Sequence, residues 1–391
     1  MNKKYILNYW QSSNYGAVLT AYALNNIIKG SHLVDNFSKT MLNRTLDFDF
    51  QTKFMNENFT SIEKYNHLIN NQLNCLEEEN IFFVGSDQVF RPKVAENILN
   101  SFLLGEINEK NKKIAFSASF GVDKKQFLKE TSPKTIEKMK IAFDLFDYIS
   151  VREKSGVDIF NSVFNKKAEW IIDPVFVLDK EIYVNLVKNE KELLPKTIVS
   201  YLIHEKNRPY KYYKTQKVFE LARTNISIEQ WLLSIKNCEL LITDSFHGMC
   251  FAIIFNKPFI AISNGTNSST RFESLLEMLD IENRCINDIK EISTTDCIFN
   301  PNYEKVNKLI DIERKKGLAF LEKVLHSPHK ISSQMISTRT KFLEILIEEF
   351  KQQANLKYQT KKEVWNLWLI IFHKYLPEPV KNIIRKIRGS K

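Results

Sequence analysis

The chain has 391 residues, of which 43% are hydrophobic and 26% charged, with a formal net charge of +10. This length corresponds to two domains, at roughly 100–200 residues each, and the composition excludes a disordered or collagen-like chain. The five cysteines are scattered and odd in number, with no paired metal-ligand spacing. We therefore expect a reducing compartment, no disulfide scaffold and no metal site.

Much of the excess positive charge lies at the C-terminal end. Residues 361–391 contain eight lysines or arginines and two acidic residues, so their net charge is +6. The remaining chain is nearly balanced, which argues against a nucleic-acid partner. No apolar run approaches the ~20 residues that a transmembrane helix needs, and the N-terminal apolar run is too short for a secretory signal. We expect a cytoplasmic protein.

The first 180 residues alternate short apolar runs with helical stretches. Apolar runs predict strands at 4–10, 81–84, 113–117, 148–151 and 170–172. Apolar residues at spacings of three and four predict a helix over 15–28. Buried runs that alternate with helices are typical of a parallel sheet covered on both faces.

The same alternation restarts after a Lys/Glu-rich segment near residue 190. Strands are predicted at 197–203, 240–243 and 258–262, and helices at 228–235, 246–255 and 305–325. A polar, serine-rich linker is expected at 327–340, followed by a helix over 340–355. The pattern predicts two Rossmann-like α/β domains, 1–185 and 196–326, and a helical, basic, amphipathic extension over 330–391.

Glycine is scarce, and half of the glycines follow predicted strands. Five of the ten lie at or just beyond the carboxyl ends of these strands, namely Gly16, Gly85, Gly121, Gly156 and Gly248. Ligands of doubly wound sheets bind at this edge, where helix N-termini offer free N–H groups to anions. Ordinary turn chemistry explains any one of them, whereas five on one edge favour a site.

Three side chains at this edge are candidates for chemistry. His247 lies between a predicted strand and a helix, where an anionic ligand would favour its protonated form and make it a general acid. Arg152 and Arg271 also follow predicted strands, and the guanidinium fork matches carboxylate and phosphate groups. A structural histidine and two surface salt bridges remain the alternatives at this point.

Seven short motifs in order resemble the polysaccharide pyruvyl transferase family over about residues 1–325. They are NYGAVL at 14–19, FVGSDQVFRP at 83–92, AFSASFG at 115–121, ISVREKSG at 149–156, DP at 173–174, TDSFHG at 243–248 and NKPF at 256–259, with Arg271 after them. The resemblance implies a GT-B-like fold, in which two Rossmann-type domains face a cleft. It also implies transfer of the enolpyruvyl group of phosphoenolpyruvate onto two sugar hydroxyls, which forms a pyruvate ketal and releases phosphate.

The resemblance implies a role for each matching residue. His247 is the expected acid and Asp87 a candidate base, and phosphoenolpyruvate is expected to bind at Arg152, Arg271, Ser245 and Gly248. The acceptor sugar is expected at Asn14, Gly16, Ser86 and Gln88. Phosphoenolpyruvate is a co-substrate, and no cofactor or metal is implied. The acceptor belongs to a capsular, exopolysaccharide or cell-wall glycan and is often lipid-linked.

The chain departs from the family pattern in two places. Some members have arginine two residues before the histidine, where this chain has Ser245. The phosphate clamp must then rely on other cations. The segment between residues 203 and 228 is also short for a full βαβα portion, which predicts a shortened second domain.

The basic tail lies beyond the resemblance and has two interpretations. An aromatic-rich apolar block at 364–372 precedes the cationic stretch 381–388, as in an interfacial helix pair on the anionic inner face of the cell membrane. The alternative is a helical hairpin packed on the protein itself or on a second identical subunit. Two other functions also stay open: a GT-B glycosyltransferase that uses a nucleotide sugar, and a non-catalytic scaffold of polysaccharide assembly.

Overall fold

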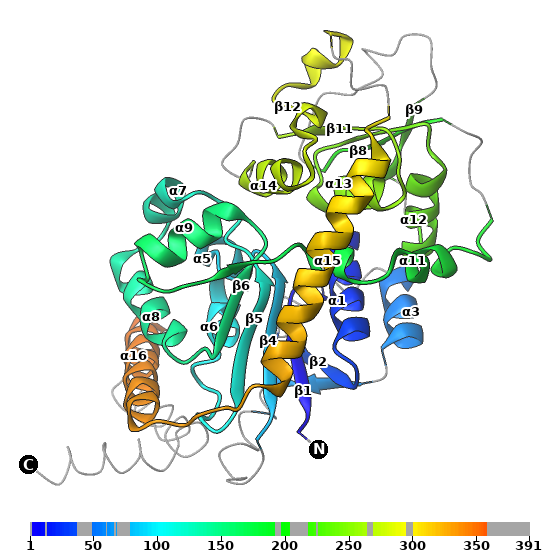
Figure 1. Cartoon of the computed structure of the whole chain (residues 1–391). Helices are drawn as coiled ribbons and strands as arrows, with labels where there is room; N and C mark the ends of the chain where they lie inside the picture. Colours follow the sequence, from blue (N-terminus) through cyan, green and yellow to red (C-terminus); the bar gives the residue numbers. More distant parts are fainter. Residues whose placement is uncertain are drawn as a thin grey trace, which may run out of the picture.

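The computed structural model describes residues 2–11, 14–36, 49–59, 61–65, 68, 79–191, 197–203, 218–223, 226–263, 269–294 and 300–357. Two parallel sheets form two halves of the molecule, with helices on both faces of the first sheet (Figure 1). The tail predictions for residues 361–391 lie outside the described residues. Within those described, no helix has the length and apolar character needed to cross a membrane.

The first half is built on a seven-stranded sheet of order β3-β2-β1-β4-β5-β6-β7, in which every pair is parallel. Its strands are β1 (Lys4–Leu7), β2 (Ser31–Asp35), β3 (Ile62–Lys64), β4 (Ile81–Asp87), β5 (Lys112–Ala118), β6 (Tyr148–Val151) and β7 (Glu169–Trp170). Its helices are α1 (Tyr15–Ile27), α3 (Asp49–Asn58), α5 (Pro92–Ala95), η1 (Glu96–Ile98), α6 (Leu99–Leu103), α7 (Lys124–Glu130), α8 (Pro133–Phe143), α9 (Lys154–Ser162), α10 (Pro174–Val177) and α11 (Lys180–Leu186).

The second half holds a five-stranded parallel sheet of order β12-β11-β10-β8-β9. Its strands are β8 (Ile198–Tyr201), β9 (Val218–Glu220), β10 (Leu240–Thr243), β11 (Phe259–Ile262) and β12 (Cys285–Ile286). Its helices are η3 (Leu221–Arg223), α12 (Ile228–Asn237), α13 (Phe246–Ile254), α14 (Thr270–Leu279), η4 (Glu282–Arg284) and η5 (Ile289–Thr294). The segment predicted to be short thus still contributes strand β9.

The apolar runs form strands because both faces of each central strand are covered. On β1, Ile6 packs into the core beneath α1, whereas Tyr5 and Leu7 point into the core on the opposite face. Successive side chains of a strand point to opposite faces, so a strand between two helical layers needs apolar residues at every position. This explains the continuous apolar runs and confirms the predicted doubly wound α/β class.

Two long helices complete the chain. α15 (Tyr303–His326) spans both halves in Figure 1, and it packs closely on the first half at Gly317. A Cβ at Gly317 would lie 2.8 Å from Val177 of α10, so only glycine allows this approach. α16 (Ser333–Lys357) packs on α8 and buries Phe342 and Leu346. The C-terminal region is therefore helical up to residue 357, and the predicted domain bounds stay a prediction.

The predicted linker over 327–340 is wrong in its second part, because α16 begins at Ser333. The Ser332 hydroxyl accepts the N–H of Met335, so it caps this helix. Arg339, which lies in the predicted linker, is buried and donates to the Glu109 carboxylate and to the Glu106 carbonyl. Burial of this arginine against the first half makes the polar segment part of the folded structure.

Each sheet has one point at which the strand order reverses. In the first sheet it lies between β1 and β4, and in the second between β8 and β10. Ligands of doubly wound proteins bind outside the carboxyl ends of the strands at such points. Asp87 ends β4, and Ser245 and His247 follow β10, so these predicted residues lie beside the two reversal points.

Candidate active site

The turn after β10 places His247 in the first turn of α13. The Thr243 hydroxyl accepts the N–H of Ser245 at 3.0 Å, and the Ser245 hydroxyl accepts the N–H of Gly248 at 3.3 Å. Ser245 is thus the N-cap of α13, a role that serine favours. Gly248 lies beneath, where a Cβ would be 2.6 Å from the Thr243 hydroxyl. These contacts hold His247 in place with 3% of its surface exposed.

Arg152 is the centre of a buried ion-pair network. It directly follows β6, and its side chain has no exposed surface. Nη1 donates to Asp173 Oδ2 at 2.6 Å and to Ser86 Oγ at 3.1 Å, and Nη2 donates to Asp87 Oδ1 at 3.2 Å. The carboxylates offset the cost of burying the guanidinium and raise the pKa of Arg152 despite its burial. The predicted residues Ser86, Asp87 and Arg152 therefore lie together.

Asp173 joins the two halves of the site, and the sequence reasoning did not predict it as a site residue. Oδ1 accepts the N–H of Val175 as the N-cap of α10, while Oδ2 accepts from Ser86 at 2.7 Å as well as from Arg152. The same Oδ2 atom lies 3.8 Å from His247 Nε2. The only sequence signal was the Asp-Pro pair after a predicted strand, which is also a common helix start.

Two guanidinium groups lie close to the aromatic ring of Phe246. The Cζ atoms of Arg152 and Arg271 lie 4.6 and 5.6 Å from the ring centroid. Burial and the nearby Arg152 cation lower the pKa of Arg271 to about 10. Its buried Nε atom has no hydrogen-bond partner among the residues that the structure describes. The Nε atom of Arg152 also has no hydrogen-bond partner among the described residues. Two neighbouring cations, each with an unpaired Nε donor, at the N-terminus of α13 form a site that favours an anion.

His247 is neutral at neutral pH in this structure. Burial, together with the Arg152 and Arg271 cations, lowers its pKa to about 4, although Asp173 and Asp87 oppose this effect. Nε2 lies 2.9 Å from the hydroxyl of Thr20 on α1. An anion bound at the two arginines would raise the pKa of this imidazole, because it would offset the positive field that now disfavours the imidazolium.

Asp87 is ionised at neutral pH. Burial raises its pKa, but Arg152, His247 and Arg271 together outweigh burial, so the pKa lies below its ordinary value. Its backbone has a φ of +87°, a conformation that few non-glycine residues adopt. Such strain is tolerated where the surrounding structure holds it, here through the contact with Arg152.

The remaining acceptor-side candidates lie at two places. Asn14 is the N-cap of α1 and accepts the N–H of Gly16 at 2.9 Å. Gly16 lies against the imidazole of His247, where a Cβ would be only 2.3 Å from Nδ1. The backbone N–H of Gln88 donates to Asp87 Oδ1 at 2.8 Å, whereas its side-chain Oε1 atom accepts from Arg91 at 2.9 Å. Arg91 is in turn held by Glu130.

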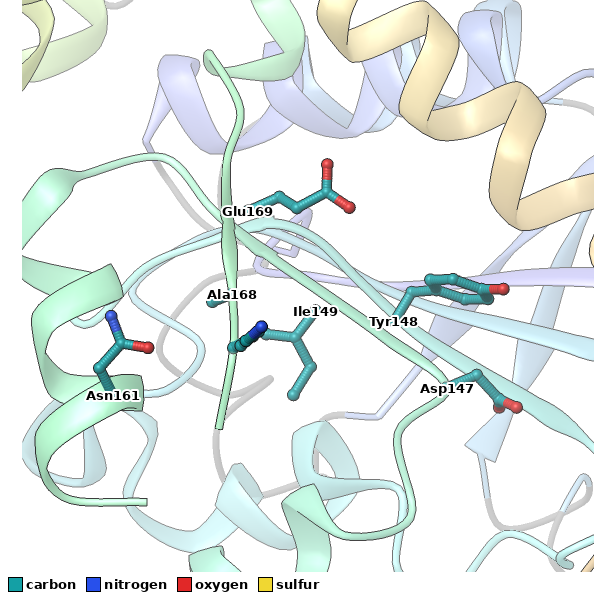
Figure 2. Close-up of a pocket in the computed structure, with 7 residues that line it drawn as sticks. Asp147, Tyr148, Ile149, Asn161, Ala168 and Glu169 are labelled. Atoms are coloured by element: carbon teal, nitrogen blue, oxygen red, sulfur yellow. The ribbon is translucent and has the colours of Figure 1, made fainter. Parts of the chain in front are cut away.

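A separate pocket lies at the opposite end of β6. It has a volume of about 510 Å³ and includes Tyr148, Asn161 and Glu169, which Figure 2 shows around one opening. Tyr148 begins β6 whereas Arg152 follows its end, so the pocket holds none of the predicted site residues. In the described parts of the chain, no group of three or more His, Cys, Asp or Glu side chains is arranged to hold a metal ion.

The fold and site define a class of protein: a GT-B-like α/β protein with a polar site at the carboxyl ends of both sheets. Within that class, the chain belongs to the polysaccharide pyruvyl transferase family, whose sequence profile matches residues 14–266. This confirms the resemblance found in the sequence. Among curated proteins, none matches the chain significantly.

Solved structures share this fold at low sequence identity. The chain is similar to a UDP-GlcNAc 2-epimerase from Neisseria meningitidis bound to UDP-GlcNAc, with a TM-score of 0.50, 10% identity, and coverage of 83% of this chain and 99% of that one. The wall teichoic acid polymerase TagF matches with a TM-score of 0.42 and 13% identity over 82% of this chain and 88% of that one. The N-terminal domain of a Candida albicans trehalose-6-phosphate phosphatase matches with a TM-score of 0.45 and 11% identity over 84% and 96%.

Proposed function

We propose that the protein transfers the enolpyruvyl group of phosphoenolpyruvate onto two hydroxyls of one sugar in a capsular, exopolysaccharide or cell-wall glycan. The observation that carries this proposal is the pair of guanidinium groups of Arg152 and Arg271 on the ring of Phe246. Phosphoenolpyruvate has a carboxylate and a phosphate close together, and two adjacent cations match two adjacent anionic groups. Family membership supports the same reaction class.

The proposed reaction balances without a cofactor. Protonation of the methylene carbon makes a methyl group and leaves an oxocarbenium-like centre at C2, which the first sugar hydroxyl attacks. Phosphate then leaves with its bridging oxygen, and the second hydroxyl closes the ketal. Of the two hydroxyl protons, one balances the proton on the methyl group and the other leaves with phosphate. The acid must lie beside the methylene carbon of phosphoenolpyruvate, because that carbon takes the proton.

His247 suits the acid role because substrate binding would charge it. The imidazole is neutral in this structure, with a pKa of about 4. A bound trianion would reverse the local field and raise that pKa, so the proton would arrive together with the substrate. This coupling keeps the imidazole uncharged until a proton acceptor is present.

Asp87 is the proposed base toward the acceptor. Its carboxylate is ionised and lies on β4, at the first sheet, beside Ser86. The proposed acceptor side comprises Asn14, Gly16, Ser86 and Gln88, and the proposed donor side also includes Ser245 and Gly248. A lipid-linked acceptor would place the enzyme at the inner face of the cell membrane, with the basic residues 361–391 on anionic lipid.

Calorimetry with phosphoenolpyruvate and, separately, with UDP-glucose tests this function. We expect phosphoenolpyruvate to bind, and Arg271→Met to weaken it about ten- to a hundredfold, because a hydrogen bond to a charged group contributes about 1.5–3 kcal/mol. Arg314→Met is the matched control, since Arg314 of α15 pairs with Asp179, the N-cap of α11, outside the site. Binding of UDP-glucose alone would instead support a nucleotide-sugar glycosyltransferase. If the wild-type protein, with its His247, binds neither phosphoenolpyruvate nor UDP-glucose, the result would favour the non-catalytic scaffold of polysaccharide assembly.

A further inference from the structure

The hydroxyl of Thr20 has its proton already engaged. The side chain is fully buried on α1, and Oγ1 donates to the carbonyl oxygen of Gly16 at 2.8 Å. The same Oγ1 atom lies 2.9 Å from Nε2 of His247. A hydroxyl has one proton and two lone pairs, and a carbonyl oxygen only accepts. Thr20 therefore offers a lone pair to the imidazole, and Nε2 carries the proton in this contact.

Asp173 favours the same tautomer. Its Oδ2 atom lies 3.8 Å from Nε2, and its negative charge stabilises a proton on that nitrogen. Thr20 and Asp173 thus both act on Nε2 and favour the tautomer that carries its proton there. The hydrogen bonds of an imidazole decide which of its two nitrogens carries the proton.

The other edge of the imidazole packs on the backbone of α1 at Gly16. A Cβ at Gly16 would be 2.3 Å from Nδ1, so any other residue would collide with the ring. Thr20 and Gly16 are one helical turn apart, and together they hold the ring: Thr20 contacts Nε2, and the Gly16 backbone lies against Nδ1. α1 follows the first sheet, whereas His247 belongs to the second, so each half of the protein supplies part of the arrangement.

We propose that Thr20 is a positioning residue, which holds His247 in the tautomer protonated at Nε2, the ring nitrogen that lies nearest Asp173 and its partner Arg152. The inference rests on the proposed acid role of His247 in pyruvyl transfer. Because Thr20 comes from the other half of the molecule, the imidazole acquires its working tautomer only when the two halves are joined at α1 and α13.

Nitrogen NMR of the full-length protein with ¹⁵N-labelled histidine tests the tautomer directly. The chain has seven histidines, and loss of one signal set in His247→Gln assigns the residue. We expect the wild type to show a protonated Nε2 and an unprotonated Nδ1. Thr20→Val should give a mixture of tautomers, whereas Thr20→Ser, which keeps the hydroxyl, should retain the wild-type pattern. A wild-type His247 protonated at Nδ1 would overturn the proposal even if Thr20→Val did not fold.

Kinetics test whether the tautomer matters. Phosphate release from phosphoenolpyruvate with methyl hexosides as acceptors should show kcat falling about ten- to a hundredfold in Thr20→Val, since general acid catalysis contributes about 10²–10⁴. The KM for phosphoenolpyruvate should stay unchanged, and Thr20→Ser should restore kcat. Thr131→Val is the matched control, because this buried hydroxyl has no hydrogen-bond partner in the described structure.

Failure of the inference is distinct from failure of the proposed function. An unchanged kcat in Thr20→Val, with or without a change of tautomer, would overturn the positioning role. A wild type that binds no phosphoenolpyruvate would refute pyruvyl transfer, and the NMR pattern of His247 would then still report whether Thr20 sets its tautomer. The binding result and the NMR result can therefore be interpreted independently.

Discussion

Gly16→Ala tests the close approach between the two halves of the molecule. A Cβ at this position would lie 2.3 Å from Nδ1, 2.4 Å from Cγ and 2.5 Å from Cβ of His247. Non-bonded carbon atoms rest about 3.5–4.0 Å apart, so the imidazole must move by about 1 Å or more. That movement would stretch the 2.9 Å contact between Nε2 and Thr20.

The substitution should affect both stability and activity. Overpacking costs about 1–3 kcal/mol of folding free energy, and alanine in a helix recovers up to about 1 kcal/mol relative to glycine. The net loss should therefore be no more than about 3 kcal/mol. A misplacement of about 1 Å at a reacting group costs about a hundredfold in rate, so the turnover of the folded protein should fall by about that factor.

The assay combines urea unfolding with phosphate release from phosphoenolpyruvate, using methyl hexosides as acceptors. Gly156→Ala is the matched control: it lies near the start of α9, and the three atoms nearest its Cβ would belong to Val151, at 3.1 Å or more. The control should keep its turnover. If Gly16→Ala kept wild-type turnover and an unshifted His247 NMR signal, the inferred packing of α1 on the imidazole would be wrong.

Three further predictions concern buried charge and pH. Arg152→Met should lower the free energy of unfolding in urea by about 3–5 kcal/mol, because it leaves the buried Asp173 carboxylate uncompensated; a loss below about 1 kcal/mol would contradict this. The pKa of His247 is about 4 in the folded protein, against 6.5 in the unfolded chain. Between pH 4 and pH 6.5, this imidazole therefore takes up its proton only when the protein unfolds. Stability should therefore fall as pH drops from 6.5 to 4, and less so in His247→Gln; equal slopes in both proteins would refute the assignment. The hydrogen bond from His329 to Asp147 raises the pKa of His329, so its contribution should be complete below about pH 6.5 and disappear as pH rises through the raised value. His329→Asn should remove this alkaline loss in pH-dependent thermal unfolding, and persistence of the loss would exclude the His329 contact as its cause.

The sequence by itself determined the central strands and the site edge. The predicted strand at 148–151 matches β6, and those at 240–243 and 258–262 match β10 and β11 within a residue. These strands are buried on both faces, so their composition alone identifies them. The order of the motifs then identified the family, and the predicted strands placed Arg152 and His247 beyond the carboxyl ends of β6 and β10. Arg271, expected in a polar loop, lies in α14.

The edge strands β3, β9 and β12 and the links between the two halves emerge only in the tertiary structure. β3 and β9 have three residues each and β12 has two, and half-exposed strands of this length carry no periodic signal. The strand predicted at 170–172 overlaps the two-residue β7 only at Trp170. Thr20 and His247 are 227 residues apart, so no local pattern pairs them. From the sequence, Asp173 is only a candidate helix cap. In the structure, β4, β6 and α13 bring Ser86, Arg152 and His247 near its Oδ2 atom. The residue types at the site can be identified from the sequence. Their hydrogen bonds and ion pairs depend on distances that only the packing of the two halves sets.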